Sequence, residues 1–107
     1  MVTESSEANW VRLCTFDKLE DGGTALVENE GDYYYVNRLG ALARVFDAVC
    51  PHHATNLSFA SIENDEVECP LHGWRFDVTN GVCIRGGRDL VERTIKVENN
   101  TVFALMA

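Results

Sequence analysis

Positively charged residues are scarce in this chain of 107 amino acids. Nine lysines and arginines stand against 17 aspartates and glutamates, which gives a formal charge of -8. Nucleic acids and anionic membrane surfaces attract cationic proteins, so we expect neither as a partner. No apolar run approaches the roughly eighteen residues of a membrane-spanning helix, and residues 1–7 have neither the basic residue nor the apolar stretch of a secretory signal. We therefore expect a cytoplasmic protein.

Length excludes a second independent core. A mass of 12.0 kDa corresponds to one small domain. With 46% apolar and 24% charged residues, the composition is that of an ordinary globular protein. No repeat or low-complexity linker divides the chain, so we expect residues 1–107 to form a single domain.

Helix signals are nearly absent. The apolar segments are short, rich in β-branched and aromatic residues, and separated by turn-forming residues about every ten positions. They predict strands at residues 10–14, 24–28, 33–37, 42–47, 66–69, 75–77, 91–98 and 101–105. Residues 15–20 alone predict a helical turn, with Thr15 as its cap. In the run Tyr33-Tyr34-Tyr35, alternation predicts at least one ring in the core and one in solvent. The expected fold class is an all-β antiparallel sandwich or barrel.

Histidine is also scarce, and all three histidines belong to or adjoin two cysteine-containing segments. Cys50-Pro51-His52 and Cys69-Pro70-Leu71-His72 each offer one thiolate and one imidazole. Two such loops can hold a metal centre from opposite sides. On ligand number alone, the set Cys50, His52, Cys69 and His72 fits tetrahedral zinc and also a 2Fe-2S cluster with two histidines on one iron, and we favour the cluster.

The residues around these ligands resemble the Rieske iron-sulfur motif. Sixteen residues separate His52 from Cys69, and the second segment continues as Gly73-Trp74-Arg75-Phe76-Asp77. The resemblance covers about residues 42–82 and implies a Rieske-like fold whose cluster-binding loops lie at about 50–57 and 69–74. It further implies one Rieske-type 2Fe-2S cluster, with the two cysteines on the buried iron and the two histidines on the iron nearer the surface.

This chain departs from the respiratory members of that family. At the positions of their two additional cysteines and two hydroxyl donors stand Thr55, Leu71, Trp74 and Phe76. With fewer hydrogen bonds to cluster sulfur, we expect a reduction potential near the low end of the Rieske range, about −150 mV. The segment 83–89 carries two glycines in place of a proline-containing cover, and we expect that cover to be flexible.

The histidine count also excludes an oxygenase active site. A Rieske oxygenase needs two further histidines for its mononuclear iron, whereas His53 alone remains here. We therefore expect no catalytic residues and no enzyme activity. The resemblance implies a monomeric ferredoxin of aromatic hydrocarbon catabolism that carries single electrons from a flavin-dependent NAD(P)H reductase to a terminal oxygenase of the ring-hydroxylating dioxygenase type. Two alternatives stay open, namely a Rieske-like subunit of a larger reductase such as nitrite reductase, and a structural Cys2His2 zinc module.

Three further features have ordinary structural interpretations. Cys14 and Cys83 lie outside the motif, and we expect them to be buried thiols without a disulfide. The acids Glu63, Asp65, Glu66 and Glu68 form either a solvated strand edge or a docking patch. Charges on a loop, such as Arg85 and Arg88, are usually hydrated.

Overall fold

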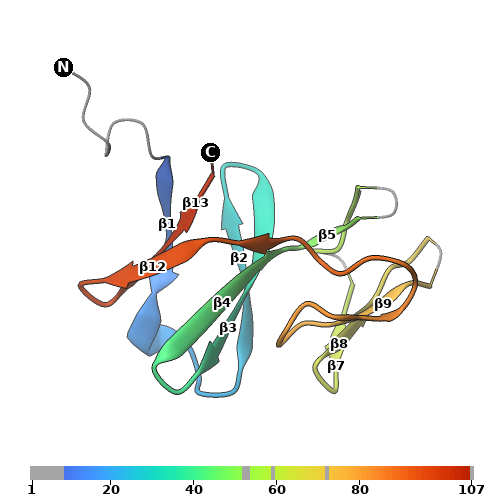
Figure 1. The fold of residues 1–107 in the computed structure, drawn as a ribbon, viewed down its shortest axis with the longest axis horizontal. Coiled ribbons are helices and arrows are strands. Elements are labelled where there is room, and N and C mark those ends of the chain that lie inside the picture. The colour runs from blue at the N-terminus through green and yellow to red at the C-terminus, as the bar shows by residue number, and fades with distance from the viewer. Residues whose placement is uncertain (1–8, 52–53, 59, 72, 107) are drawn as a thin grey trace.

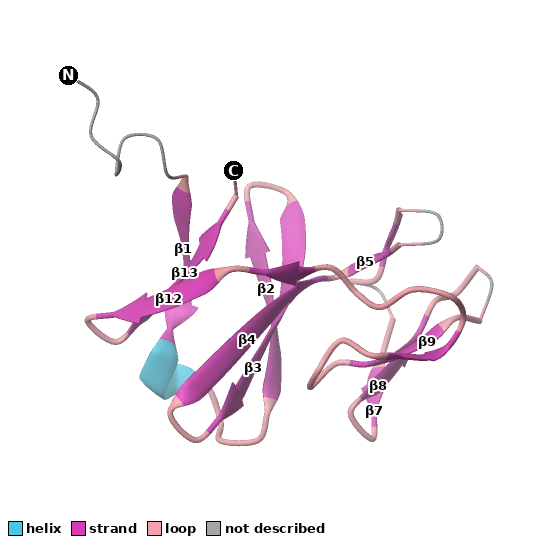
Figure 2. Ribbon diagram, viewed as in Figure 1, coloured by secondary structure: helices cyan, strands magenta, loops and turns pink. Residues whose placement is uncertain are grey.

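The computed structural model describes residues 9–51, 54–58, 60–71 and 73–106. Almost all regular structure in this part of the chain consists of antiparallel strands (Figures 1 and 2), which confirms the expected all-β class. The exception is a single 3-10 turn, η1, at Phe16–Lys18. Among the described residues, no helix has the length and apolar character required to cross a membrane.

Two sheets form one half of the fold. The first has the strand order β11-β4-β3-β2 and the second the order β1-β13-β12. Their bounds are β1 Trp10–Thr15, β2 Thr24–Asn29, β3 Asp32–Leu39, β4 Leu42–Asp47, β11 Glu92–Arg93, β12 Ile95–Glu98 and β13 Thr101–Leu105. Positive φ angles at Gly31 (88°) and Asn100 (62°) close the β2–β3 and β12–β13 hairpins, at turn-forming residues that lie between the predicted strands.

The other half carries the two expected ligand loops. It contains the sheet β10-β9-β8-β7 and the two-stranded pair β5-β6. These strands are short: β5 Val49–Cys50, β6 Thr55–Asn56, β7 Ile62–Glu63, β8 Glu66–Glu68, β9 Arg75–Asp77 and β10 Cys83–Arg85. In Figure 1 they lie at the end of the molecule opposite β1, β12 and β13.

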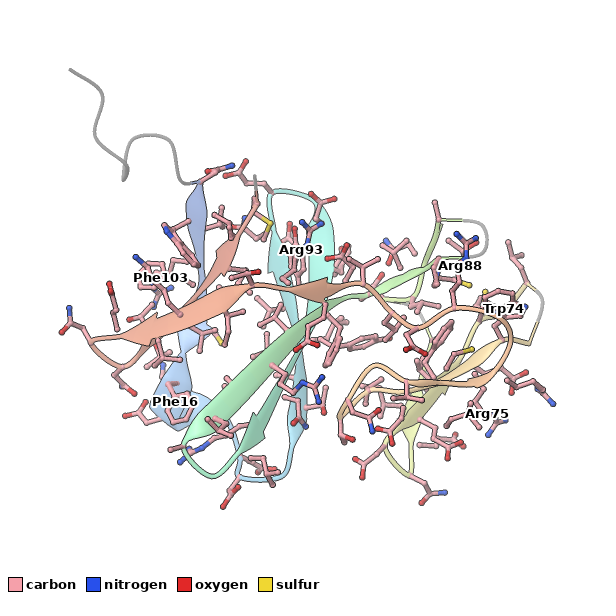
Figure 3. The ribbon with its side chains drawn as sticks, viewed as in Figure 1. Phe16, Trp74, Arg75, Arg88, Arg93 and Phe103 are labelled. Carbon is pink, nitrogen blue, oxygen red and sulfur yellow. The ribbon has the colours of Figure 1, made fainter. Side chains whose placement is uncertain are left out.

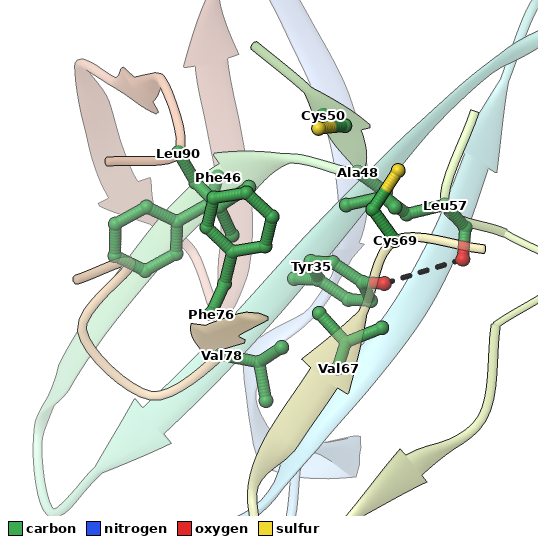
Figure 4. Packing of buried hydrophobic residues seen from close by; sticks show 10 residues of the cluster. All are labelled: Tyr35, Phe46, Ala48, Cys50, Leu57, Val67, Cys69, Phe76, Val78 and Leu90. Atoms are coloured by element: carbon green, nitrogen blue, oxygen red, sulfur yellow. Dashed lines mark hydrogen bonds between the residues drawn. The ribbon is translucent and has the colours of Figure 1, made fainter. Parts of the chain in front are cut away.

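The central strands β3 and β4 separate two buried clusters. One cluster contains Leu13, Leu19, Tyr34, Val36, Val45, Val102 and Ala104. The other, beneath the ligand loops, contains Tyr35, Phe46, Ala48, Cys50, Leu57, Val67, Cys69, Phe76, Val78 and Leu90 (Figure 4). Alternation along each strand sends neighbouring side chains to opposite faces, and both faces are covered. The expectation of one solvent-facing tyrosine ring is therefore wrong: Tyr34 and Tyr35 are both buried and Tyr33 is half-buried.

Local details differ from the predicted elements in two further places. The strand expected at 91–98 is interrupted at Thr94, because β11 pairs with β4 whereas β12 pairs with β13. Thr15 occupies the N-cap of η1 but makes no side-chain cap hydrogen bond. Its hydroxyl instead accepts a hydrogen bond from Arg12 Nη2 at 3.2 Å.

Candidate metal centre

The first ligand loop is closed at its base by the β5–β6 pair. Cys50 pairs with Thr55 across this ladder, and the amide of Leu57 donates to the carbonyl of Ala48 at 2.8 Å. Cys50 is fully buried, whereas Ala54, on the returning side, is exposed and has a φ of 54°. The chain therefore leaves the core at Cys50 and returns to it at Leu57. The predicted ligand His52, and His53 beside it, lie outside the described residues.

The second loop is a tight turn that follows β8. The amide of Cys69 donates to the carbonyl of Trp74 at 2.7 Å, and the amide of Gly73 donates to the carbonyl of Cys69 at 3.0 Å. Gly73 has a φ of 71°, a left-handed conformation that glycine adopts without strain. Cys69 is buried, and Leu71 near the tip is 62% exposed. The predicted ligand His72 lies outside the described residues.

The structure brings the two predicted cysteine ligands to one place. Cys50 and Cys69 belong to the same buried cluster, and Figure 4 shows both at its upper end, above Tyr35. All four cysteines are free thiols. Cys14 packs against the other cluster, and burial raises the pKa of its thiol, which favours the protonated form. Cys14 and Cys83 are half-buried rather than buried as expected.

The described residues fit the sulfur side of an iron-sulfur cluster. Iron in such clusters prefers thiolate ligands, and two reduced cysteines begin adjacent loops. The side-chain oxygen of Ser58 is also buried without a hydrogen-bond partner in the described part of the structure, directly after the first loop. Within that same part, no three His, Cys, Asp or Glu side chains are grouped suitably for a metal ion.

Tyr35 supports the first loop from below. Its hydroxyl donates to the carbonyl of Leu57 at 3.3 Å, as the dashed line in Figure 4 shows. Burial raises the pKa of Tyr35 to about 12, so the phenol stays neutral and can serve as a donor at neutral pH.

The segment 83–89 contacts both loops, a feature that the sequence did not reveal. Arg88 Nη2 donates to the carbonyl of Pro51 at 3.2 Å, and Arg85 Nε donates to the carbonyl of Gly73 at 3.0 Å. Gly86 and Gly87 pack against the ring of Trp74. The glycine pair thus allows close packing, where we expected only a flexible cover. The sequence shows that Arg85 and Arg88 are charged, but it does not show which carbonyl groups they bind.

The acidic residues before Cys69 are partly neutralised. Arg75 donates to Glu66 at 3.1 Å and to Glu68 at 2.6 Å, and Glu68 also lies 3.9 Å from Arg85 Nη2. Glu66 and Glu68 are therefore ion-paired members of the β8–β9 sheet and do not form an uncompensated acidic patch.

Comparisons with known proteins agree with this architecture. Residues 9–94 match the family model described as Rieske [2Fe-2S] domain. The ferredoxin component of the naphthalene 1,2-dioxygenase/salicylate 5-hydroxylase systems of a Ralstonia species is 30% identical over 100 residues, which cover 92% of this chain and 96% of that protein. Cholesterol 7-desaturase nvd 1 of Ciona intestinalis is 42% identical over 77 residues, which cover 70% of this chain and 16% of the desaturase.

A solved structure gives the same result. The ferredoxin of carbazole 1,9a-dioxygenase from Nocardioides aromaticivorans IC177 superimposes with a TM-score of 0.62 at 26% sequence identity. The match covers 89% of this chain and 95% of that ferredoxin.

Proposed function

Because the chain belongs to the Rieske [2Fe-2S] domain family, we propose that it is a ferredoxin that carries single electrons to a terminal oxygenase. In this proposal Cys50, His52, Cys69 and His72 hold one 2Fe-2S cluster. The observation that carries the proposal is the pair of buried, reduced cysteines that begin two adjacent loops over one core. The nearly complete coverage of a relative named as a ferredoxin component supports the same function.

The residues of the chain divide the work between a buried and an exposed side. Cys50 and Cys69 would hold the cluster from within the core, where the packing of Tyr35, Phe76 and Leu57 excludes water. The histidine positions adjoin residues near the loop tips, such as the exposed Pro70 and Leu71. When bound, the cluster supplies a one-electron redox couple. We propose that the histidine side faces the partner proteins, because ligands at the protein surface shorten the distance over which an electron must be transferred.

Two partners follow from this function. We propose a flavin-dependent NAD(P)H reductase as electron donor and a ring-hydroxylating dioxygenase as acceptor, in line with the relative from Ralstonia, which is named as a component of such systems. The chain itself is not an enzyme in this proposal, because its three histidines cannot supply both the cluster and a mononuclear iron. We also propose that it acts as a cytoplasmic monomer. Its four free cysteines are compatible with a reducing compartment.

The match to the desaturase favours a second candidate. That relative is more similar in sequence, but the chain spans 16% of its length. The chain would then correspond to the electron-accepting part of a larger oxidising protein. The two candidates differ in one property: only a free carrier passes electrons from a reductase to a separate oxygenase when the purified 107-residue chain is added.

The ligand assignment is tested by paired cysteine variants. We expect Cys50→Ser and Cys69→Ser to lose nearly all bound iron and acid-labile sulfide, because serine is a poor ligand for an iron-sulfur cluster. Cys14→Ser is the matched control, because Cys14 packs against the hydrophobic cluster on the other face of β3 and β4. This variant should retain the wild-type content of iron and sulfide. Equal loss in Cys14→Ser would contradict the assignment. Zinc in place of iron and sulfide in the wild-type protein would establish the structural zinc alternative.

A further inference from the structure

The strap, defined here as residues 83–89, is anchored to the core at its base. The amide of Leu90 donates to the carbonyl of Gly81 at 2.9 Å, and the amide of Cys83 donates to Asp89 Oδ1 at 2.8 Å. Leu90 is buried in the same cluster as the two ligand cysteines. Both ends of the strap are therefore held beneath the ligand loops.

Each loop receives one arginine from the strap, next to a predicted histidine ligand. The carbonyl of Pro51, which accepts from Arg88, belongs to the peptide bond that leads to His52. The carbonyl of Gly73, which accepts from Arg85, belongs to the residue directly after His72. Two side chains of one short segment thus bind a backbone carbonyl beside each predicted histidine ligand, before it in the first loop and after it in the second.

The middle of the strap packs on the second loop. Gly86 has a φ of 142°, and a Cβ atom there would overlap the indole ring of Trp74. A Cβ atom at Gly87 would lie 3.4 Å from the same ring. Figure 3 shows Trp74 and Arg88 together at this end of the molecule, far from Phe16 and Phe103. The close backbone approach brings both arginines within reach of the loops.

The cysteine side and the histidine side of the proposed metal centre are held in place by different contacts. The cysteines are held by the buried core, whereas the loop tips project from it. Residues 50–62 and 69–74 contain no Asp, Glu, Lys or Arg. The guanidinium groups of Arg85 and Arg88 therefore bring positive charge to two loops that have none of their own, although Glu68 at 3.9 Å partly compensates the charge of Arg85.

We propose that Arg85 and Arg88 are positioning residues of the metal centre. Their hydrogen bonds hold the carbonyls of Pro51 and Gly73, which directly adjoin the predicted ligands in the sequence, and their charges favour the form of the cluster that has gained an electron. This inference rests on the proposed function, since it concerns the histidine side of the same centre.

The experiment compares three variants of the loaded full-length protein. In the double variant Arg85→Met and Arg88→Met, both hydrogen bonds and both charges are lost. We expect iron release to a chelator to become about tenfold faster, the low end of the effect of outer ligand contacts on metal affinity, and the reduction potential to fall. The double lysine variant keeps both charges and should recover the wild-type potential. Arg12→Gln, on an exposed arginine of β1 that bonds to Thr15, should change neither quantity.

The outcomes separate this inference from the proposed function. If the wild-type protein binds no iron and sulfide, the proposed function fails. If it loads normally and the methionine variant keeps both its release rate and its potential, the positioning role of the strap is overturned and the proposed function stands. If both double variants fail to load, the single variants Arg85→Met and Arg88→Met are measured in the same way, with unchanged values again overturning the role.

Discussion

At the scale of single residues, burial determines which polar groups serve the metal centre. Tyr35 and Tyr34 are neighbours in sequence, yet only Tyr35 lies in the hydrophobic cluster that contains both predicted ligand cysteines. The hydroxyl of Tyr35 donates to the carbonyl of Leu57, which also accepts a hydrogen bond from the amide of Ala60 at 2.9 Å. Leu57 therefore keeps a hydrogen-bond donor even if the phenol is removed.

The raised pKa of Tyr35 predicts a loss of stability in alkaline solution. Well below pH 10.0, the ordinary pKa of tyrosine, the phenol is neutral in both folded and unfolded chains. Between pH 10.0 and about 12 the unfolded chain releases the proton while the folded chain retains it, so the free energy of unfolding falls. Denaturant unfolding at stepwise pH should show this decline in the wild-type protein.

The variant Tyr35→Phe is the control for that decline. We expect it to lower the free energy of unfolding at neutral pH by about 1 kcal/mol, the usual net contribution of one hydrogen bond. It should also make the decline above pH 10.0 smaller, because the phenol of Tyr35 is gone, while Cys14 and Tyr34, whose pKa values are also raised by burial, still contribute. An unchanged alkaline decline in this variant would assign the effect to other groups.

At the scale of elements, sequence pattern succeeded where alternation runs over several residues. The predicted bounds of β4, β9 and β13 match the structure, and those of β1, β2 and β3 differ by one or two residues at the ends. The strands β5, β6 and β7, which were not predicted, have only two residues each, too few to show a period. Their existence depends on pairing between segments, which local pattern does not encode.

Only part of the candidate site could be predicted from the sequence. Spacing and residue type predict Cys50 and Cys69 as ligands, and the structure places both in one buried hydrophobic cluster. His52 and His72 lie outside the described residues and stay predictions. The contacts of Arg85 and Arg88 could not be predicted. Both arginines bind backbone carbonyl groups, which every residue has, so the residue type does not indicate which carbonyl accepts the hydrogen bond.

The close packing of the strap predicts that Gly86→Ala, although it adds only one methyl group, lowers the free energy of unfolding. In Gly86→Ala the added methyl group meets the Trp74 ring and the backbone sits at a φ of 142°. We expect a loss of about 1–3 kcal/mol in the free energy of unfolding, the range for a strained backbone residue, together with faster iron release. Gly40→Ala is the matched control: it also has a positive φ, 63°, but no atom lies within 4 Å of the added Cβ. Equal effects of the two variants on iron release would contradict the packing role of Gly86.

At the scale of the whole molecule, charge governs how the carrier meets its partners. The chain carries a formal charge of -8, and the negative thiolate ligands offset the positive core of an oxidised cluster. The loaded protein therefore stays acidic before and after it accepts an electron. We expect complementary positive surfaces on its partners, which attract the carrier over distances of about 8 Å at physiological salt.

This charge predicts a salt-dependent electron transfer. The second-order rate of reduction by the reductase should fall as ionic strength rises, because salt screens the attraction between the oppositely charged proteins. Stopped-flow absorbance at several sodium chloride concentrations measures this rate. A rate that rises with salt would show that like charges meet in the complex.

The central claim is that two histidines and two cysteines hold one iron-sulfur cluster, and nitrogen coordination tests it most directly. Protein labelled with nitrogen-15 in histidine alone is reduced and studied by electron–nuclear double resonance. We expect strong couplings from two histidine nitrogens. They should be retained in His53→Ala and partly lost in His52→Ala and His72→Ala if a cluster still forms. A spectrum without strong histidine couplings in a protein that contains iron and sulfide would contradict it.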